Sequence, residues 1–107
     1  MIEFKWSPSE KKAARKAFDL ALARELRAIR RETEDLLRKS GDESSIWRLH
    51  DYLSEKRREV DLKYDFRYSV LLLVFSRLVS ERWLTVDVLS GIGAEKVEVI
   101  QRVISSG

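Results

Sequence analysis

The stretch SPSEKKAARKAFDLALARELRAIRRETEDLLRK, residues 7–39, decides the fold of this 107-residue chain. Ser7 can cap a helix, Pro8 suits its first position and Glu10 completes a capping box, so a helix is expected to begin here. Apolar side chains then recur every three or four residues, as on one face of an α-helix. They are Ala14, Phe18, Ala21, Leu22, Leu26, Ile29, Leu36 and Leu37, with Thr33 on the same face. Continued to Lys39, this helix is about 48 Å long at 1.5 Å per residue, which predicts an elongated molecule.

A turn and a second helix follow. In Ser40-Gly41-Asp42, Gly41 can adopt the left-handed conformation, and Asp42 or Ser44 can cap the next helix. The apolar stripe of that helix consists of Ile46, Leu49, Leu53, Val60 and Tyr64. Because the connection is short, the two helices are predicted to form an antiparallel hairpin.

The periodicity slips between residues 61 and 65, where we expect a turn. The segment from Phe66 to about Trp83 has apolar residues on all sides between Val70 and Phe75, which indicates a buried helix. A β-strand is the competing prediction, but the segment continues past Val79 without a strand-type turn, which favours the helix. Thr85 can cap a short helix over residues 86–89, which Gly91-Ile92-Gly93 should end, and residues 94–104 form a last amphipathic helix.

These elements predict an all-α fold in a single domain, residues 1–107. A long antiparallel hairpin with a dimerisation surface occupies about residues 7–60, and a small helical head occupies about residues 61–107. A chain of this length buries only a modest core, so a second partner chain would help to stabilise this elongated fold.

Composition excludes several classes of protein. There is no cysteine for a disulfide or a thiolate metal site, and a single histidine cannot build a zinc site, so no metal or cofactor is expected. The net charge is only +3, whereas nucleic-acid binders carry dense basic patches, so a nucleic-acid partner is not favoured. The longest uncharged run, residues 68–76, is much shorter than the roughly 20 residues that span a bilayer. We therefore expect a cytoplasmic protein without membrane insertion.

Trp47, His50, Asp51 and Arg57 are the candidate site residues. The first three lie at i, i+3 and i+4 on the second helix, and Arg57 is placed on the same side further along. Each could be an ordinary boundary or surface residue. Trp and Arg are also the residue types that most often anchor protein interfaces, so a protein-binding patch is the alternative. Dimer-interface candidates lie in the neighbouring apolar stripe: Ile46, Leu49 and Leu53.

Catalysis is not expected. His50 and Ser54 are at i and i+4, but Asp51 follows His50 directly and should point about 100° away, so it cannot orient the imidazole as a triad requires. The sequence also contains no glycine-rich phosphate loop, no HExxH and no nucleophile elbow.

The segment from Leu89 to Ile100 is similar to a helix-hairpin-helix motif, in which a Gly-apolar-Gly turn offers N–H groups to a DNA phosphate. Three acidic residues near the turn, Asp87, Glu95 and Glu98, outnumber Lys96. A purely structural glycine turn between two small helices is therefore favoured over a small DNA-binding module.

Several words of the sequence resemble the fluorescence recovery protein family of cyanobacteria. They are WRLHDYLS at 47–54, KR at 56–57, KYDFR at 63–67, VF at 74–75, WL at 83–84 and WSPSE at 6–10. The resemblance implies an all-helical homodimer that binds the photoactivated orange carotenoid protein, speeds its return to the orange form and helps to detach it from the phycobilisome. It implies no covalent chemistry and no cofactor. It also places the patch of Trp47, His50, Asp51 and Arg57 by the dimer interface, and further partner contacts on the head.

Two positions depart from the family pattern. Leu62 stands where a glycine is expected, and Leu73 where an aromatic residue of the head is expected. A dimeric all-α adaptor for a different protein is the alternative that these differences leave open.

Overall fold

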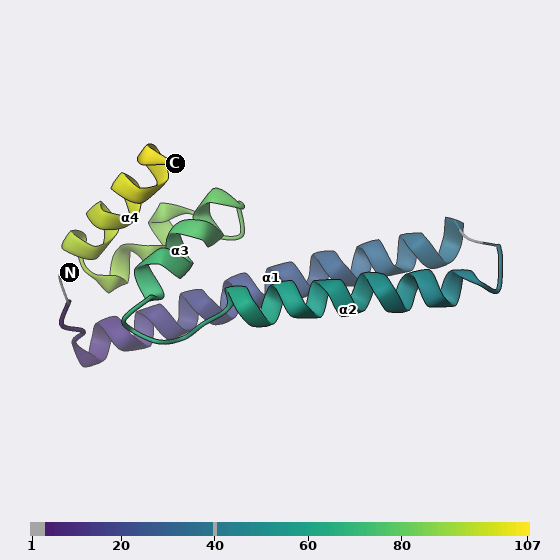
Figure 1. Cartoon of the computed structure of the whole chain (residues 1–107). Coiled ribbons are helices and arrows are strands. Elements are labelled where there is room, and N and C mark those ends of the chain that lie inside the picture. Colours follow the sequence, from purple (N-terminus) through teal and green to yellow (C-terminus); the bar gives the residue numbers. More distant parts are fainter. Residues whose placement is uncertain (1–3, 40) are drawn as a thin grey trace.

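The structure, a computed structural model, describes residues 4–39 and 41–107. In these residues the chain forms four α-helices and one 3₁₀ helix, and no strand (Figure 1). In chain order the helices are α1 (Pro8–Lys39), α2 (Ser45–Lys63), α3 (Leu71–Ser80), η1 (Val86–Ile92) and α4 (Ala94–Ser106). The molecule measures 53 × 23 × 22 Å. The all-α class and the elongated shape are confirmed.

The capping box at the start of α1 is confirmed. The Glu10 N–H donates to Ser7 Oγ at 3.1 Å, and the Ser7 N–H donates to Glu10 Oε1 at 2.9 Å. Two of the four N–H groups that a helix leaves unpaired at its start are commonly satisfied in this way. From there α1 runs the full length of the molecule, and α2 returns beside its second half (Figure 1).

The turn between α1 and α2 is organised by Asp42. Its carboxylate accepts hydrogen bonds from the Ser44 N–H at 3.1 Å and from Ser44 Oγ at 2.7 Å. The Ser44 side chain makes no capping bond to α2, so of the two predicted capping residues only Asp42 orders the entry to the helix. Ser40, which was predicted to lie in this turn, is outside the described residues.

After α2 the predicted helices are present with shifted boundaries. Helix α2 continues through Lys63, so the turn begins slightly later than predicted, and residues 64–70 form a link to α3. Helix α3 confirms the prediction of a helix rather than a strand. It is shorter than predicted: it begins at Leu71, and Phe66 lies in the link. Arg82, with φ of 68°, has left the helical conformation beyond its end.

The predicted break at Gly91-Ile92-Gly93 occurs only at its last residue, so the short helix is longer than the predicted residues 86–89. Helix η1 extends through Gly91 and Ile92, and Gly93, with φ of 105°, ends it instead. Gly91 has a different role, since a Cβ atom there would lie 2.8 Å from the Ala13 Cβ atom. Its missing side chain lets η1 approach α1.

The hydrophobic core lies at one end of the molecule. Its apolar residues come from the first half of α1 and from the C-terminal region. They are Ala14, Ala17, Phe18, Ala21, Leu71, Val74, Phe75, Leu78, Leu84, Leu89, Ile92 and Ile100. We call the body formed by α3, η1 and α4 the head; it packs on the first half of α1 (Figure 1). Helix α2 contributes no apolar residue to this core.

Candidate functional site

Three of the four predicted site residues form a contact cluster on the first turns of α2. The Trp47 and His50 rings lie 6.4 Å apart between centroids at an interplanar angle of 73°, an edge-to-face arrangement. His50 Nδ1 lies 3.5 Å from Asp51 Oδ1. We call Trp47, His50 and Asp51 the α2 cluster. Trp47 is 69% exposed, which presents a large indole to solvent.

Arg57 lies apart from this cluster. It follows His50 by seven residues, about 10 Å along the helix axis. Its Nε atom pairs with Asp61 Oδ2 at 3.6 Å. Arg57 also lines an apolar groove between α1 and α2, which makes it a residue of the groove rather than of the α2 cluster.

The groove between α1 and α2 has a volume of about 450 Å³. Its lining residues are Leu22, Leu26, Ile29, Leu53, Lys56, Arg57, Val60 and Asp61. Leu26 is 49% and Leu53 39% exposed, so the stripes that the two helices turn toward each other are only partly covered within one chain. An open apolar stripe of this kind is typical of a protein interaction surface.

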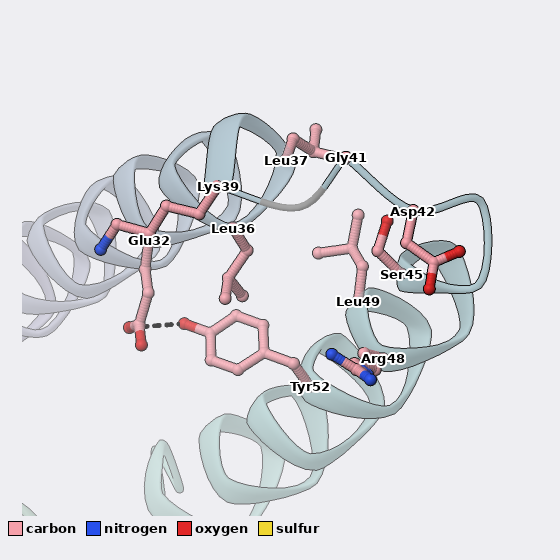
Figure 2. A pocket seen from close by; sticks show the side chains of 10 residues that line it. All are labelled: Glu32, Leu36, Leu37, Lys39, Gly41, Asp42, Ser45, Arg48, Leu49 and Tyr52. Atoms are coloured by element: carbon pink, nitrogen blue, oxygen red, sulfur yellow. Dashed lines mark hydrogen bonds between the residues drawn. The ribbon is translucent and has the colours of Figure 1, made fainter.

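A second pocket, of about 540 Å³, lies at the hairpin tip (Figure 2). Leu36 and Leu49 point into it, and the Tyr52 hydroxyl donates a 2.7 Å hydrogen bond to Glu32 Oε2. Partial burial and the neighbouring Glu32 carboxylate raise the pKa of Tyr52 to about 12, so the phenol remains a donor at neutral pH.

The three predicted dimer-interface residues lie along the same helix, but no two of them line the same hollow. Leu49 lines the tip pocket and Leu53 the groove between α1 and α2, while Ile46 is exposed near the start of α2.

One geometric expectation about catalysis was wrong. Asp51 was expected to point away from His50, but the two side chains bend toward each other across the helix surface. Both are more than half exposed, and none of the hydrogen bonds of the described residues joins Ser54 to His50. Serine nucleophiles require such a bond to a base, so the arrangement is not that of a catalytic triad. Within residues 4–39 and 41–107 there is also no group of three or more His, Asp and Glu side chains that could hold a metal.

Lys96 is occupied by internal contacts. Its Nζ atom lies 3.1 Å from Glu10 Oε1 and 4.8 Å from the centre of the Trp6 ring, and the residue is buried. It is the only cationic residue between Leu89 and Ile100. Because a DNA phosphate cannot reach it there, its burial counts against the DNA-binding module.

None of the helices in the described part of the chain combines the length and the apolar character needed to cross a bilayer.

Comparison with known proteins identifies the family. A family model described as "Photoprotection regulator fluorescence recovery protein" matches residues 6–104. This chain belongs to the fluorescence recovery protein family. The chain is 34% identical over 99 residues to the fluorescence recovery protein of Synechocystis sp., covering 92% of this chain and 91% of that protein. As a member of the family it is a photoprotection regulator, and the family is not one of known enzymes.

Solved structures of fluorescence recovery proteins share the fold. That from Fremyella diplosiphon is 39% identical, with a TM-score of 0.86, and the match covers 96% of this chain and 100% of that one. That from Synechocystis sp. is 33% identical, with a TM-score of 0.87, over 94% and 99% of the two chains. The resemblance to the fluorescence recovery protein family seen in the sequence is thus confirmed over nearly the whole chain.

Sequence reasoning missed a buried ion-pair network in this family member. Lys63 is enclosed between Glu25 and Glu81. One signal was available, since Glu25 follows Ala21 by four residues on the buried face of α1, where an apolar residue would be expected.

Proposed function

We propose that this chain acts as a homodimer that binds the photoactivated form of the orange carotenoid protein and accelerates its return to the inactive orange form. Quenching at the phycobilisome would end as a result. The observation that carries the proposal is the family match over residues 6–104. The reaction needs no covalent chemistry, because a protein that binds one conformer, or the transition state between conformers, more tightly shifts the equilibrium or the rate.

The surface chemistry of α2 supports this proposal. The α2 cluster offers an exposed indole beside an imidazole and a carboxylate, and Arg57 offers a guanidinium at the edge of an apolar groove. Aromatic and guanidinium groups around an apolar centre are typical of interface hot spots. We propose that the hairpin carries the dimer contacts through Ile46, Leu49 and Leu53. We place the partner contacts on Trp47, His50, Asp51 and Arg57, with further contacts on the head.

A relaxation assay tests the proposal. Purified orange carotenoid protein is converted to its red form by light, and its return in the dark is followed by absorbance with and without this protein. We expect faster relaxation with the parent chain, and at least about 10-fold less acceleration with Trp47→Ala or Arg57→Ala, as for loss of an interface hot spot. Arg30→Ala is the matched control, since Arg30 is an exposed arginine of α1 in an i,i+4 pair with Glu34. A relaxation rate unchanged by excess parent protein would overturn the proposal.

A second candidate function rests on the two departures from the family pattern. Leu62 and Leu73 are 76% and 61% exposed, so two large apolar side chains lie on the surface where the family pattern differs. A dimeric adaptor for a different protein would use these two side chains together with the patch that contains Trp47 and Arg57. It predicts capture of a protein other than the orange carotenoid protein in a pull-down, with loss of capture in the Trp47→Ala and Arg57→Ala variants.

A further inference from the structure

Helix α2 has no fully buried apolar residue in this chain. Of its 19 residues, the only buried one is Lys63, at its C-terminal end. The apolar core joins α1, α3, η1 and α4 without α2. The apolar side chains of α2 are at most partly covered, by α1, so its fully buried contacts are polar.

Lys63 makes the most buried of these contacts. Its Nζ atom lies 2.6 and 2.7 Å from the two Glu25 carboxylate oxygens and 2.6 Å from Glu81 Oε1. The side chains of Lys63 and Glu25 are only 4% and 8% exposed. A buried ammonium is strongly unfavourable without its carboxylates, so Lys63 is stable at this place only while both acidic residues surround it.

The two carboxylates tie the lysine to different parts of the fold. Glu25 belongs to α1 and also accepts a 2.7 Å hydrogen bond from the Tyr64 hydroxyl. Burial and that bond raise the pKa of Tyr64, so the phenol stays protonated and keeps donating. Glu81 follows α3 and accepts from Arg77 Nε at 2.8 Å and from Trp83 Nε1 at 3.2 Å. One ammonium thus connects α1, α2 and the end of α3.

A second hydrogen bond beside the network also joins α1 to the segment after α3. Arg24 Nη1 donates to the Trp83 carbonyl at 3.0 Å. Among the described residues no buried side-chain nitrogen or oxygen lacks a hydrogen-bond partner. Removal of Lys63 would leave the Glu25 carboxylate buried without its cation, while the contacts between α1 and the head would remain.

We propose that Lys63 is a conformational latch that holds the C-terminal end of α2 against α1 and the head, so that its loss lets α2 move about the link of residues 64–70 while the head stays folded. Because α2 carries Trp47, His50, Asp51 and Arg57, the latch sets where these side chains lie relative to the head. The inference concerns the chain itself and does not depend on the identity of its partner.

Hydrogen exchange read by mass spectrometry tests the latch. In a Lys63→Met variant, amides of α2 are expected to exchange at least about 10-fold faster, since breaking a buried pair costs several kcal/mol, while amides of α3 and α4 stay within about 2-fold of the parent. Lys56→Met is the matched control, because it is the same substitution on the same helix at a lysine that is not buried: its side chain is 34% exposed, and it contacts the Glu59 carboxylate at 3.5 Å and the Tyr52 ring at 5.8 Å. Unchanged α2 exchange in Lys63→Met, or equal acceleration in all helices, would overturn the latch.

Two further measurements keep the test decisive. If Lys63→Met lacks the helical circular dichroism of the parent, Glu81→Gln replaces it, since that change leaves the Glu25 pair intact and should accelerate exchange only in α2 and the link. Light scattering on the same samples measures whether the variant has lost its second copy, which could also have protected the α2 amides. Faster α2 exchange in a variant with the mass of the parent supports the latch. If exchange is faster only in samples whose mass has fallen to that of one chain, the second copy protects α2 and the latch is overturned.

Discussion

At the scale of single residues, small side chains decide how closely the head can approach α1. Ala14, Ala17 and Ala21 are at most 1% exposed and lie one turn apart on the buried face of the helix. Gly91 on η1 comes within contact of the neighbouring Ala13. Larger residues at these positions would be as apolar but would separate the two backbones, so volume rather than hydrophobicity is the property that matters here.

Gly91→Ala should destabilise the protein. The new Cβ atom would lie 2.8 Å from the Ala13 Cβ atom, which belongs to a helix and cannot rotate away. We expect a loss of about 1–3 kcal/mol in the free energy of unfolding, as for overpacked cores, measured by urea denaturation. Gly41→Ala is the matched control, because no atom lies within 4 Å of its added Cβ. Equal stability of the two variants would contradict the close approach of η1 to α1.

At the scale of elements, the start of α1 is joined to α4 by one carboxylate. Glu10 accepts from the Ser7 N–H in the capping box and also pairs with the buried Lys96 of α4. The Ser7 backbone bond and the Lys96 ammonium hold the pKa of Glu10 below its usual value of 4.5. The cap of one helix thereby becomes part of the packing between two.

This arrangement predicts a pH dependence. A carboxyl whose pKa is lower in the folded than in the unfolded state contributes stability above its unfolded pKa and loses it as the pH falls through the folded pKa. Glu10→Gln should therefore be less stable than the parent at pH 7, and its stability should fall less steeply below about pH 5. Urea denaturation at several pH values measures both effects. Glu55→Gln, at a surface carboxylate that pairs with Arg58, is the control, and a variant curve parallel to that of the parent would refute the role of Glu10.

At the scale of the whole molecule, the core and the hairpin are separate in space. The buried apolar residues lie at one end of a 53 Å molecule, while the second half of α1 and nearly all of α2 form a two-helix arm. Two helices alone cannot cover all of their apolar stripes, and here the groove between α1 and α2 stays open. A second copy of the chain would complete a four-helix arrangement and cover it.

The proposed homodimer predicts a mass twice the 12.6 kDa of one chain in light scattering. Leu26→Glu or Leu53→Glu should yield a monomer, because each places a charge in the groove that the second copy covers. Leu62→Glu makes the same change on α2 outside the groove and should leave the dimer intact. A parent mass of 12.6 kDa at micromolar concentration would refute the dimer.

Much of the fold could be predicted because its signals are local. The capping box placed the start of α1 at the correct residue, and the spacing of three and four predicted its length. The boundaries around η1 were missed because Gly91 resembles a helix breaker in sequence, while its actual function depends on Ala13, far away in the chain. For the candidate site, spacing brought Trp47, His50 and Asp51 together correctly but did not separate Arg57, whose neighbour Asp61 lies one turn further along.

The sequence by itself determined the helices, the hairpin and the family, because capping, periodicity and short family-like sequence motifs are properties of neighbouring residues. The tertiary structure alone decided which charges are buried. Lys63 and Lys96 look like surface residues in sequence, yet both are enclosed by carboxylates that lie 18 to 86 positions away. The free energy of burying a charge depends on partners brought together only by folding, so no local pattern could assign these two lysines their places.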